Sequence, residues 1–192
     1  MRLEELPGNY HVKRGLEVAA VTVGVRTLLI GSPLSDARKF AQTGIAKMVG
    51  DLAYSPPCPC GYFEELDREC LCNKRGPAFK GHRRSFHTAG IRLRVACPLG
   101  EEIISDFVGE GEDAIRGRVY GAKKRLEGIP DTLCPEGKSL LIHANEQLGF
   151  HARGVREIVS VSRSIAAMDT SCRILPVHLL EAIQYHAYGQ TK

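Results

Sequence analysis

The sequence contains no tryptophan, and only six tyrosines and six phenylalanines are found among its 192 residues. Its core must therefore be built mainly from aliphatic side chains. No apolar run approaches the roughly 20 residues that a membrane helix needs. The opening residues, MRLEE, are polar and acidic, unlike the basic and then apolar start of a secretory signal. We accordingly expect no membrane partner, and the reducing cytoplasm is the default location.

A strong excess of charge is also missing, because the net charge is only +4. This value does not by itself indicate a nucleic-acid partner. With 43% hydrophobic and 25% charged residues, the composition is that of a folded chain and excludes intrinsic disorder. The seven cysteines are an odd number, so they cannot all pair within the chain. In a reducing compartment such cysteines more often bind metal or stay free.

The most informative segment holds two Cys-x-Cys pairs, Cys58 with Cys60 and Cys70 with Cys72. Four thiolates delivered in two pairs are what a tetrahedral zinc ion needs, so the cofactor we expect is zinc. The segment between the pairs is polar and charged, and a metal would give it order. Cys-x-Cys is tighter than the usual zinc spacing, and four reduced, partly buried cysteines are the alternative.

The first third of the chain has an α/β pattern. Apolar spacing predicts a helix over residues 9–20, and the continuous apolar run at residues 27–30 suits a buried parallel strand. A Gly-Ser-Pro turn follows, and Ser35 can cap a further helix that we expect to reach Val49. Strand, glycine turn and helix together form the outline of a phosphate-binding loop.

The chemistry of such a loop is absent, however. Where a Walker A loop has its second glycine, its lysine and its hydroxyl residue, this chain has Asp36, Ala37 and Arg38. A carboxylate at a phosphate-facing turn repels the ligand, although Arg38 restores some positive charge. If the turn binds nucleotide, Gly31, Ser35 and Arg38 are the candidate residues. A plain strand-to-helix turn is the alternative, and the pattern favours it.

A basic tract lies at residues 74–94, where lysines and arginines occur without any acidic residue. One interpretation is contact with nucleic-acid phosphates, for which we single out Lys80, Arg83 and Arg84. A solvated loop is the alternative. The end of the tract alternates in polarity and predicts a strand that begins near Ile91.

From Glu112 onward the sequence predicts helices only. Acidic residues open the first helix, basic residues close it, and Gly128 and Pro130 end it. Three further helices follow after Ser139, the last with Pro176 in its first turn. The isolated histidines of this region are expected to be surface or packing residues and not ligands.

Several segments together resemble one known family, the magnesium-chelatase-like AAA+ ATPases, and within it the ComM/YifB subgroup. They are GNYHVKRGLEVAA at 8–20, LLIG at 28–31, PCPCG at 57–61, REC-x-C at 68–72, LGFHAR at 148–153 and EAIQY at 181–185. The resemblance implies ATP binding and hydrolysis with Mg²⁺, coupled to DNA remodelling. It implies docking on itself or on full-length relatives through hexamer-type surfaces. It also implies that Arg153 reaches the γ-phosphate from a helical lid, with a solvent-facing arginine as the alternative.

The resemblance further implies a fold. An AAA+ sheet has strand order 5-1-4-3-2, and this chain lacks the segment that carries strands 2 and 3 and the Walker B acidic pair. We therefore expect a truncated AAA+ P-loop-like α/β core over residues 1–110, with the four-cysteine loop at 58–72 and about three parallel strands. An all-α lid should follow over 111–192.

The same gaps bear on activity. The position aligned with the family's trans-acting arginine is Gly90, and the Walker lysine and Walker B pair are missing. Phosphoryl transfer depends on such positioned charges. We therefore expect that hydrolysis is lost, which leaves a pseudo-ATPase or assembly subunit. A small zinc-stabilised nucleic-acid-binding module and a product without activity remain as alternatives.

Overall fold

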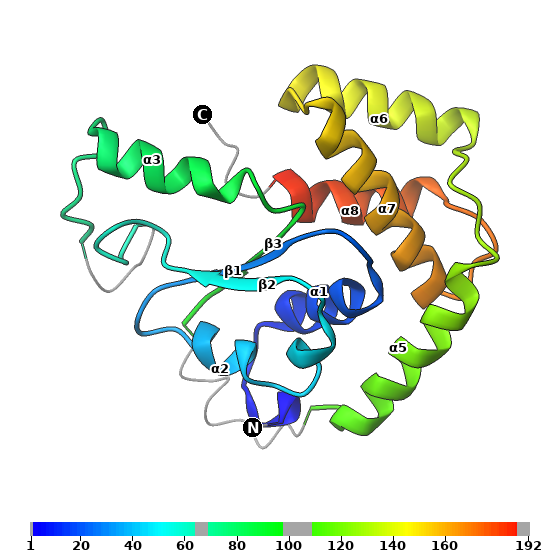
Figure 1. The fold of residues 1–192 in the computed structure, drawn as a ribbon, viewed down its shortest axis with the longest axis horizontal. Coiled ribbons are helices and arrows are strands. Elements are labelled where there is room, and N and C mark those ends of the chain that lie inside the picture. Colours follow the sequence, from blue (N-terminus) through cyan, green and yellow to red (C-terminus); the bar gives the residue numbers. More distant parts are fainter. Residues whose placement is uncertain (1, 64–68, 98–108, 188–192) are drawn as a thin grey trace.

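The computed structural model describes residues 2–63, 69–97 and 109–187. A three-stranded parallel sheet of order β2-β1-β3 forms one part, and helices form the other (Figure 1). The strands are β1 (Thr27–Gly31), β2 (Leu52–Ser55) and β3 (Ile91–Val95). The helices are α1 (Tyr10–Val21), α2 (Ala37–Ala41), α3 (Pro77–Phe86), α5 (Glu112–Leu126), α6 (Pro135–Leu148), α7 (Ala152–Met168) and α8 (Pro176–Ala187), with short 3₁₀ turns η1 (Leu3–Glu5) and η2 (Ala46–Met48). The expected order of an α/β region and then an all-α region is confirmed.

The central strand β1 is buried along its whole length, as its apolar sequence requires. On one face of the sheet Leu29 and Leu93 join the main core with α1, while on the other face Leu28 and Ile30 pack with Phe86 of α3. The strand order is the contiguous 5-1-4 arrangement expected for an AAA+ sheet without strands 2 and 3. β2 forms here although Leu52–Ser55 is a weak strand sequence, because it pairs in register with β1.

The prediction of one long helix over residues 35–49 is wrong. Helix α2 ends at Ala41, and the chain turns before η2. Thr43 Oγ1 donates to the carbonyl of Phe40 at 2.8 Å and accepts from the amide of Ala46 at 3.3 Å, which replaces helical hydrogen bonds. Gly44 packs so closely against Glu112 that a side chain would overlap it. These tertiary contacts outweigh the apolar period that predicted the helix.

Helices α5 to α8 are joined to the sheet region by buried and half-buried arginines. Arg14 of α1 donates to Asp169 at 2.8 Å and to Glu181 of α8 at 3.1 Å. Arg92 of β3 is only 2% exposed and donates to the carbonyls of Phe86 and His186. These carbonyls close helices α3 and α8, where the helix dipole favours a cation. Arg92, counted in the basic tract from sequence, is therefore a structural residue.

Candidate metal centre and the turn after β1

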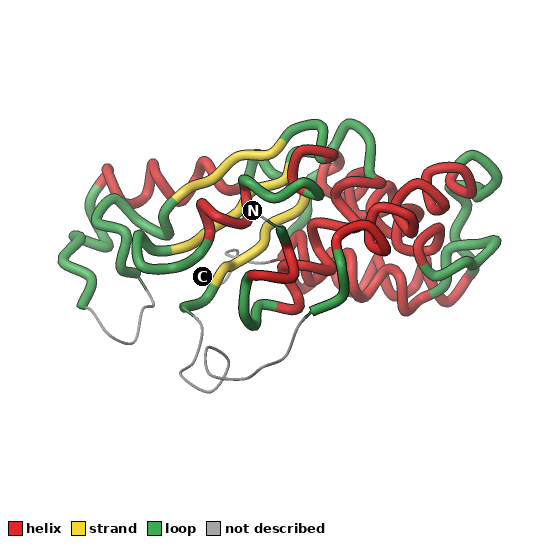
Figure 2. The backbone as a smooth tube through the Cα atoms, turned by 90° about the horizontal axis from the view of Figure 1, so that it is seen from below, coloured by secondary structure: helices red, strands yellow, loops and turns green. Residues whose placement is uncertain are grey.

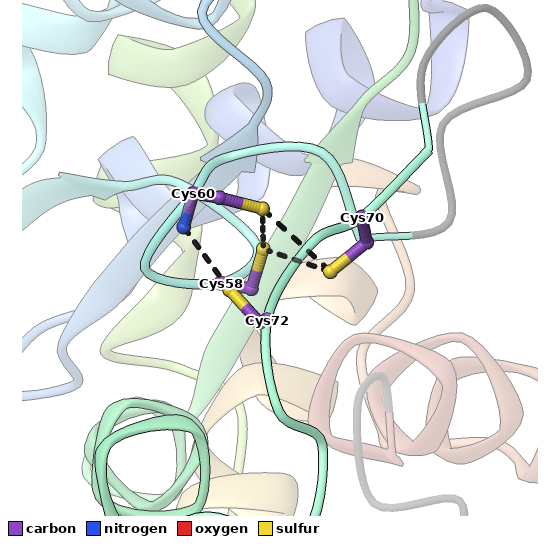
Figure 3. A group of neighbouring side chains, drawn as sticks. All are labelled: Cys58, Cys60, Cys70 and Cys72. Atoms are coloured by element: carbon purple, nitrogen blue, oxygen red, sulfur yellow. Dashed lines mark hydrogen bonds between the residues drawn. The ribbon is translucent and has the colours of Figure 1, made fainter.

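The four cysteines of the two Cys-x-Cys pairs gather at one point (Figure 3). Their sulfur atoms all lie within 4.8 Å of one another. The Cys58 sulfur is 3.3 Å from that of Cys60 and 3.7 Å from that of Cys70, and Cys60 and Cys70 are 3.6 Å apart. A tetrahedral zinc site with Zn–S bonds of about 2.3 Å has sulfur–sulfur edges of about 3.8 Å. The donor set and its spacing therefore fit zinc.

Backbone geometry imposes this arrangement. Cys58 is fully buried at the root of the loop, and the Gly61 N–H closes a turn onto the Cys58 carbonyl at 2.9 Å. Gly61 has a φ of 88°, in the left-handed region that favours glycine. The backbone N–H of Cys60 donates to the sulfur of Cys72 at 3.3 Å. Such a bond favours a thiolate at Cys72, although the burial and thiol neighbours of Cys72 outweigh it in the absence of metal.

Protonation of the cluster is uneven. Partial burial acts to raise the pKa of the Cys60 thiol, but hydrogen bonds from the Tyr62 backbone and from the neighbouring thiols outweigh it and lower that pKa to about 6. Burial and the same thiol neighbours raise the pKa of Cys72 to about 12. A metal ion must displace the remaining protons, so its binding is coupled to pH.

Helix α3 is attached to the cysteine loop. Phe63 of the loop and Phe79 of α3 meet edge to face, with ring centroids 5.2 Å apart, and Lys74 lies over the Phe63 ring at 5.3 Å. His82 of α3 donates to the Pro56 carbonyl at 2.8 Å. The loop follows the carboxyl end of β2, and α3 runs from it back toward the start of β3, with Phe86 packed on the face of the sheet (Figure 1).

The residues predicted to contact nucleic acid all lie on α3. Lys80 and Arg84 are exposed and one helical turn apart, so they share a face. Arg83 is on the same helix, although its side chain lies outside the described atoms. The middle of the basic tract is thus a helix and not a loop, and Lys80 and Arg84 are exposed on it.

The turn after β1 is filled by the protein's own groups. Ser35 Oγ donates to the Ser32 carbonyl at 2.9 Å and accepts from the Ala37 amide at 3.4 Å. The Tyr54 hydroxyl donates to the Gly31 carbonyl at 3.1 Å. The Arg38 guanidinium lies over the Tyr54 ring, 5.6 Å from its centroid. Gly31, Ser35 and Arg38 therefore do lie near one another, with the Ser35 hydroxyl and the Gly31 carbonyl hydrogen-bonded within the chain and the exposed Arg38 side chain over the Tyr54 ring.

Comparison with known families gives a match in the helical region. Residues 113–186 match the family model described as magnesium chelatase, subunit ChlI C-terminal. The matched region contains almost all of α5 to α8. The match shows that the region of α5 to α8 is similar to the C-terminal region of that subunit. No curated protein matches the sequence. Within the described residues no helix is sufficiently long and apolar to cross a membrane.

Arg153 lies inside this chelatase-like region, at the start of α7, and donates to Glu157 at 2.8 Å. Glu157 is buried beside Gly90, the residue before β3. Gly90 lies at the amino end of the strands and Gly31 at their carboxyl end. Gly31 pairs with Val95, five residues after Gly90, so the two glycines are about 16 Å apart along the strand direction. Within one chain, the structure does not bring Arg153 to the turn after β1.

Sequence reasoning missed two residues of this region. The Gly61 backbone supports the cysteine cluster, and the PCPCG segment carried that signal. The contact of Tyr54 with the Gly31 carbonyl had no sequence signal, because it depends on β2 pairing beside β1. The sequence also gave no indication of a cleft of about 390 Å³ at the start of α5. The cleft is lined by Arg2, Glu4, Gln42, Gly44, Lys47, Gly111, Glu112, Asp113 and Arg116.

Proposed function

We propose that this chain is a ComM/YifB-type member of the chelatase-like AAA+ proteins that has lost ordinary ATP hydrolysis and serves as an assembly subunit. The turn after β1 carries the proposal. The Gly31 carbonyl accepts a hydrogen bond from the Tyr54 hydroxyl, and the Ser35 side chain packs closely against Gly31. Ala37 occupies the position of the phosphate-binding lysine. Phosphoryl transfer is catalysed by positioned positive charge. Because this turn lacks the lysine and is filled by protein atoms, we infer that it does not catalyse phosphoryl transfer in the ordinary way.

The nucleotide test uses the whole purified chain, a fluorescent ATP analogue and Mg²⁺. We expect no binding up to millimolar analogue. Micromolar binding would contradict the proposal, and Arg38→Ala and Arg153→Ala would then show which arginine replaces the missing lysine. Lys124→Ala, an exposed position on α5, is the control for a general loss of positive charge.

Assembly is tested separately. As an assembly subunit, the chain should co-purify with a full-length chelatase-like AAA+ relative when the two are produced together. Absence of a complex in that experiment counts against the subunit role and leaves the nucleotide result unaffected.

A second candidate function is favoured by the position of α3. Lys80 and Arg84 are exposed on a helix that is fixed to the cysteine cluster through Phe79 and His82. A zinc ion held in a reducing compartment, the cytoplasm, would order the loop and so position this basic face against nucleic-acid phosphates.

Salt dependence tests this second function. Fluorescence anisotropy with duplex DNA should show a binding constant that falls as salt rises. The double variant Arg83→Ala with Arg84→Ala should weaken binding and lower the log–log salt slope by about 2. The pair Lys123→Ala and Lys124→Ala on α5 removes the same charge elsewhere and should change neither. Binding that is indifferent to salt excludes the phosphate-contact mechanism.

A further inference from the structure

The two edges of the sheet differ. At the β3 edge, side chains from the start of α1 supply hydrogen bonds to the backbone. His11 Nε2 donates to the Arg94 carbonyl at 2.6 Å. The Asn9 side chain accepts from the Ala96 amide at 2.9 Å and donates to the Ala96 carbonyl at 3.1 Å. The backbone around the end of β3 is thus engaged within the chain.

Within the part of the chain that the structure describes, the outer edge of β2 has no such partners. Thr27 of β1 donates to the Asp51 carbonyl at 2.8 Å. Successive strand residues direct their backbone groups alternately to the two sides, so those of Leu52 and Tyr54 point away from β1. Among the residues described in the structure, no hydrogen bond reaches these groups. In Figure 2 the strand that runs into the grey 98–108 trace is β3, and β2 forms the opposite rim.

Of the usual protections, β2 has a short length and following prolines but no charged residue of its own. Natural edge strands are shielded by lysines, bulges or a covering segment, since open edges pair with other strands. The sequence Leu-Ala-Tyr-Ser of β2 carries no charge, and all its residues are partly exposed. Pro56 and Pro57 end the strand and limit any added pairing to a short stretch. The edge is therefore short and open, with a defined length.

We propose that β2 pairs antiparallel with β2 of a second copy of this chain, about a two-fold axis at Ala53. In this register Leu52 lies opposite Tyr54 of the second copy. Both outward N–H groups and both outward C=O groups of each strand are then satisfied. The two sheets become one continuous sheet of order β3-β1-β2-β2-β1-β3.

Self-complementarity argues for a second copy as the occupant. The apolar Leu52 meets the aromatic Tyr54, a favourable cross-strand pair. Asp51, whose side chain is 64% exposed, lies opposite the neutral Ser55 of the second copy, so no like charges face each other. Registers centred on Leu52 or Tyr54 leave outward groups unpaired. Because the contact is short, we expect a weak, micromolar dimer.

Sedimentation velocity of the full chain over a range of concentrations tests the proposal. The wild type should show a reversible monomer–dimer equilibrium. Ser55→Asp places a second carboxylate opposite Asp51 and should raise the dimer Kd about 2- to 30-fold relative to the neutral, similarly shaped Ser55→Asn. Ser55→Lys should lower the Kd below that of Ser55→Asn. A strictly monomeric wild type, or equal Kd values for the Asp and Asn variants, overturns the proposal.

Amide hydrogen exchange supplies an independent readout. The Leu52 and Tyr54 amides should become more protected as protein concentration rises, whereas the Ala53 amide, which faces β1, should be protected at all concentrations. Leu52→Pro removes an outward donor without removing a bond to β1 and should abolish the dimer. Concentration-independent exchange at Leu52 and Tyr54 contradicts the pairing even if the proline variant fails to fold.

Discussion

Gly61 of the cysteine loop packs directly against Pro33 in the turn after β1. A methyl group at position 61 would lie 2.7 Å from Pro33 Cδ, closer than real side chains approach. This contact holds the candidate metal centre against the strand-to-helix turn, so the two sites singled out from sequence are physically joined.

Replacement of Gly61 by alanine should therefore be costly. The left-handed backbone at Gly61, with φ of 88°, costs a residue with a side chain about 1–2 kcal/mol, and the contact with Pro33 adds strain. Urea unfolding of the zinc-loaded protein measures the change. Gly50→Ala is the matched control, because nothing lies within 4 Å of its added methyl group. Equal stability of the two variants would show that the loop is not held by this contact.

Zinc removal should destabilise the cysteine loop and α3 together. A chelator is expected to lower the thermal midpoint and to increase hydrogen exchange in α3, because Phe63 and Phe79 link the two. Cys70→Ser should reproduce the effect of the chelator. Cys172→Ser replaces an exposed cysteine outside the cluster and should leave the midpoint unchanged.

Zinc affinity should rise with pH. Without metal the pKa of Cys72 is raised to about 12, so its thiol is protonated at neutral pH and zinc binding must release that proton. Competition titrations with a chromogenic chelator between pH 6 and pH 8 measure the affinity, after correction for the chelator's own protonation. An affinity that does not change with pH would show that Cys72 is not a ligand.

Stability should fall in mild acid because of His186. Burial, followed by the charge of Arg92, lowers the pKa of His186 from its ordinary 6.5 to about 4. Between these values the unfolded chain takes up a proton that the folded chain refuses, so stability present above pH 6.5 is lost as pH falls toward 4. The loss at pH 5 is about 2 kcal/mol.

Urea unfolding at pH 7 and pH 5 measures this loss. The variant His186→Gln cannot titrate, so its stability should fall less between the two pH values. His143 is exposed on α6, and His143→Gln should behave like the wild type. Identical pH dependence in all three proteins would contradict the assignment to His186.

The link between α1 and α8 should also be measurable. Arg14→Ala leaves the carboxylates of Asp169 and Glu181 without their arginine, and we expect a loss of about 1–2 kcal/mol for this partly exposed group. Arg14→Lys should recover part of the loss because it keeps the charge. Arg156→Ala, at an exposed position on α7, should have little effect. Thermal unfolding of the three variants compares them, and a neutral Arg14→Ala would remove this residue from the link.

Local patterns in the sequence determined several features of this protein. Apolar periodicity located α1 and the helices after Glu112, the continuous run at residues 27–30 located the central strand, and the Cys-x-Cys spacing located the candidate metal centre. These signals depend on residues close together in the chain, where side-chain period and turn chemistry decide the structure. The resemblance of short segments added the strand order, because a shortened sheet keeps its contiguous strands.

Only the tertiary structure decided the rest. Thr43 and the close approach of Gly44 to Glu112 ended the helix that periodicity extended to Val49. Arg92 was expected to be a surface charge in the basic tract. It is instead buried, and it holds the end of α8 through the His186 carbonyl. Parallel pairing separated Arg153 from Gly31, and it left the outer edge of β2 open within the described chain. Each of these outcomes depends on contacts between distant segments, whose energies have no local signature in the sequence.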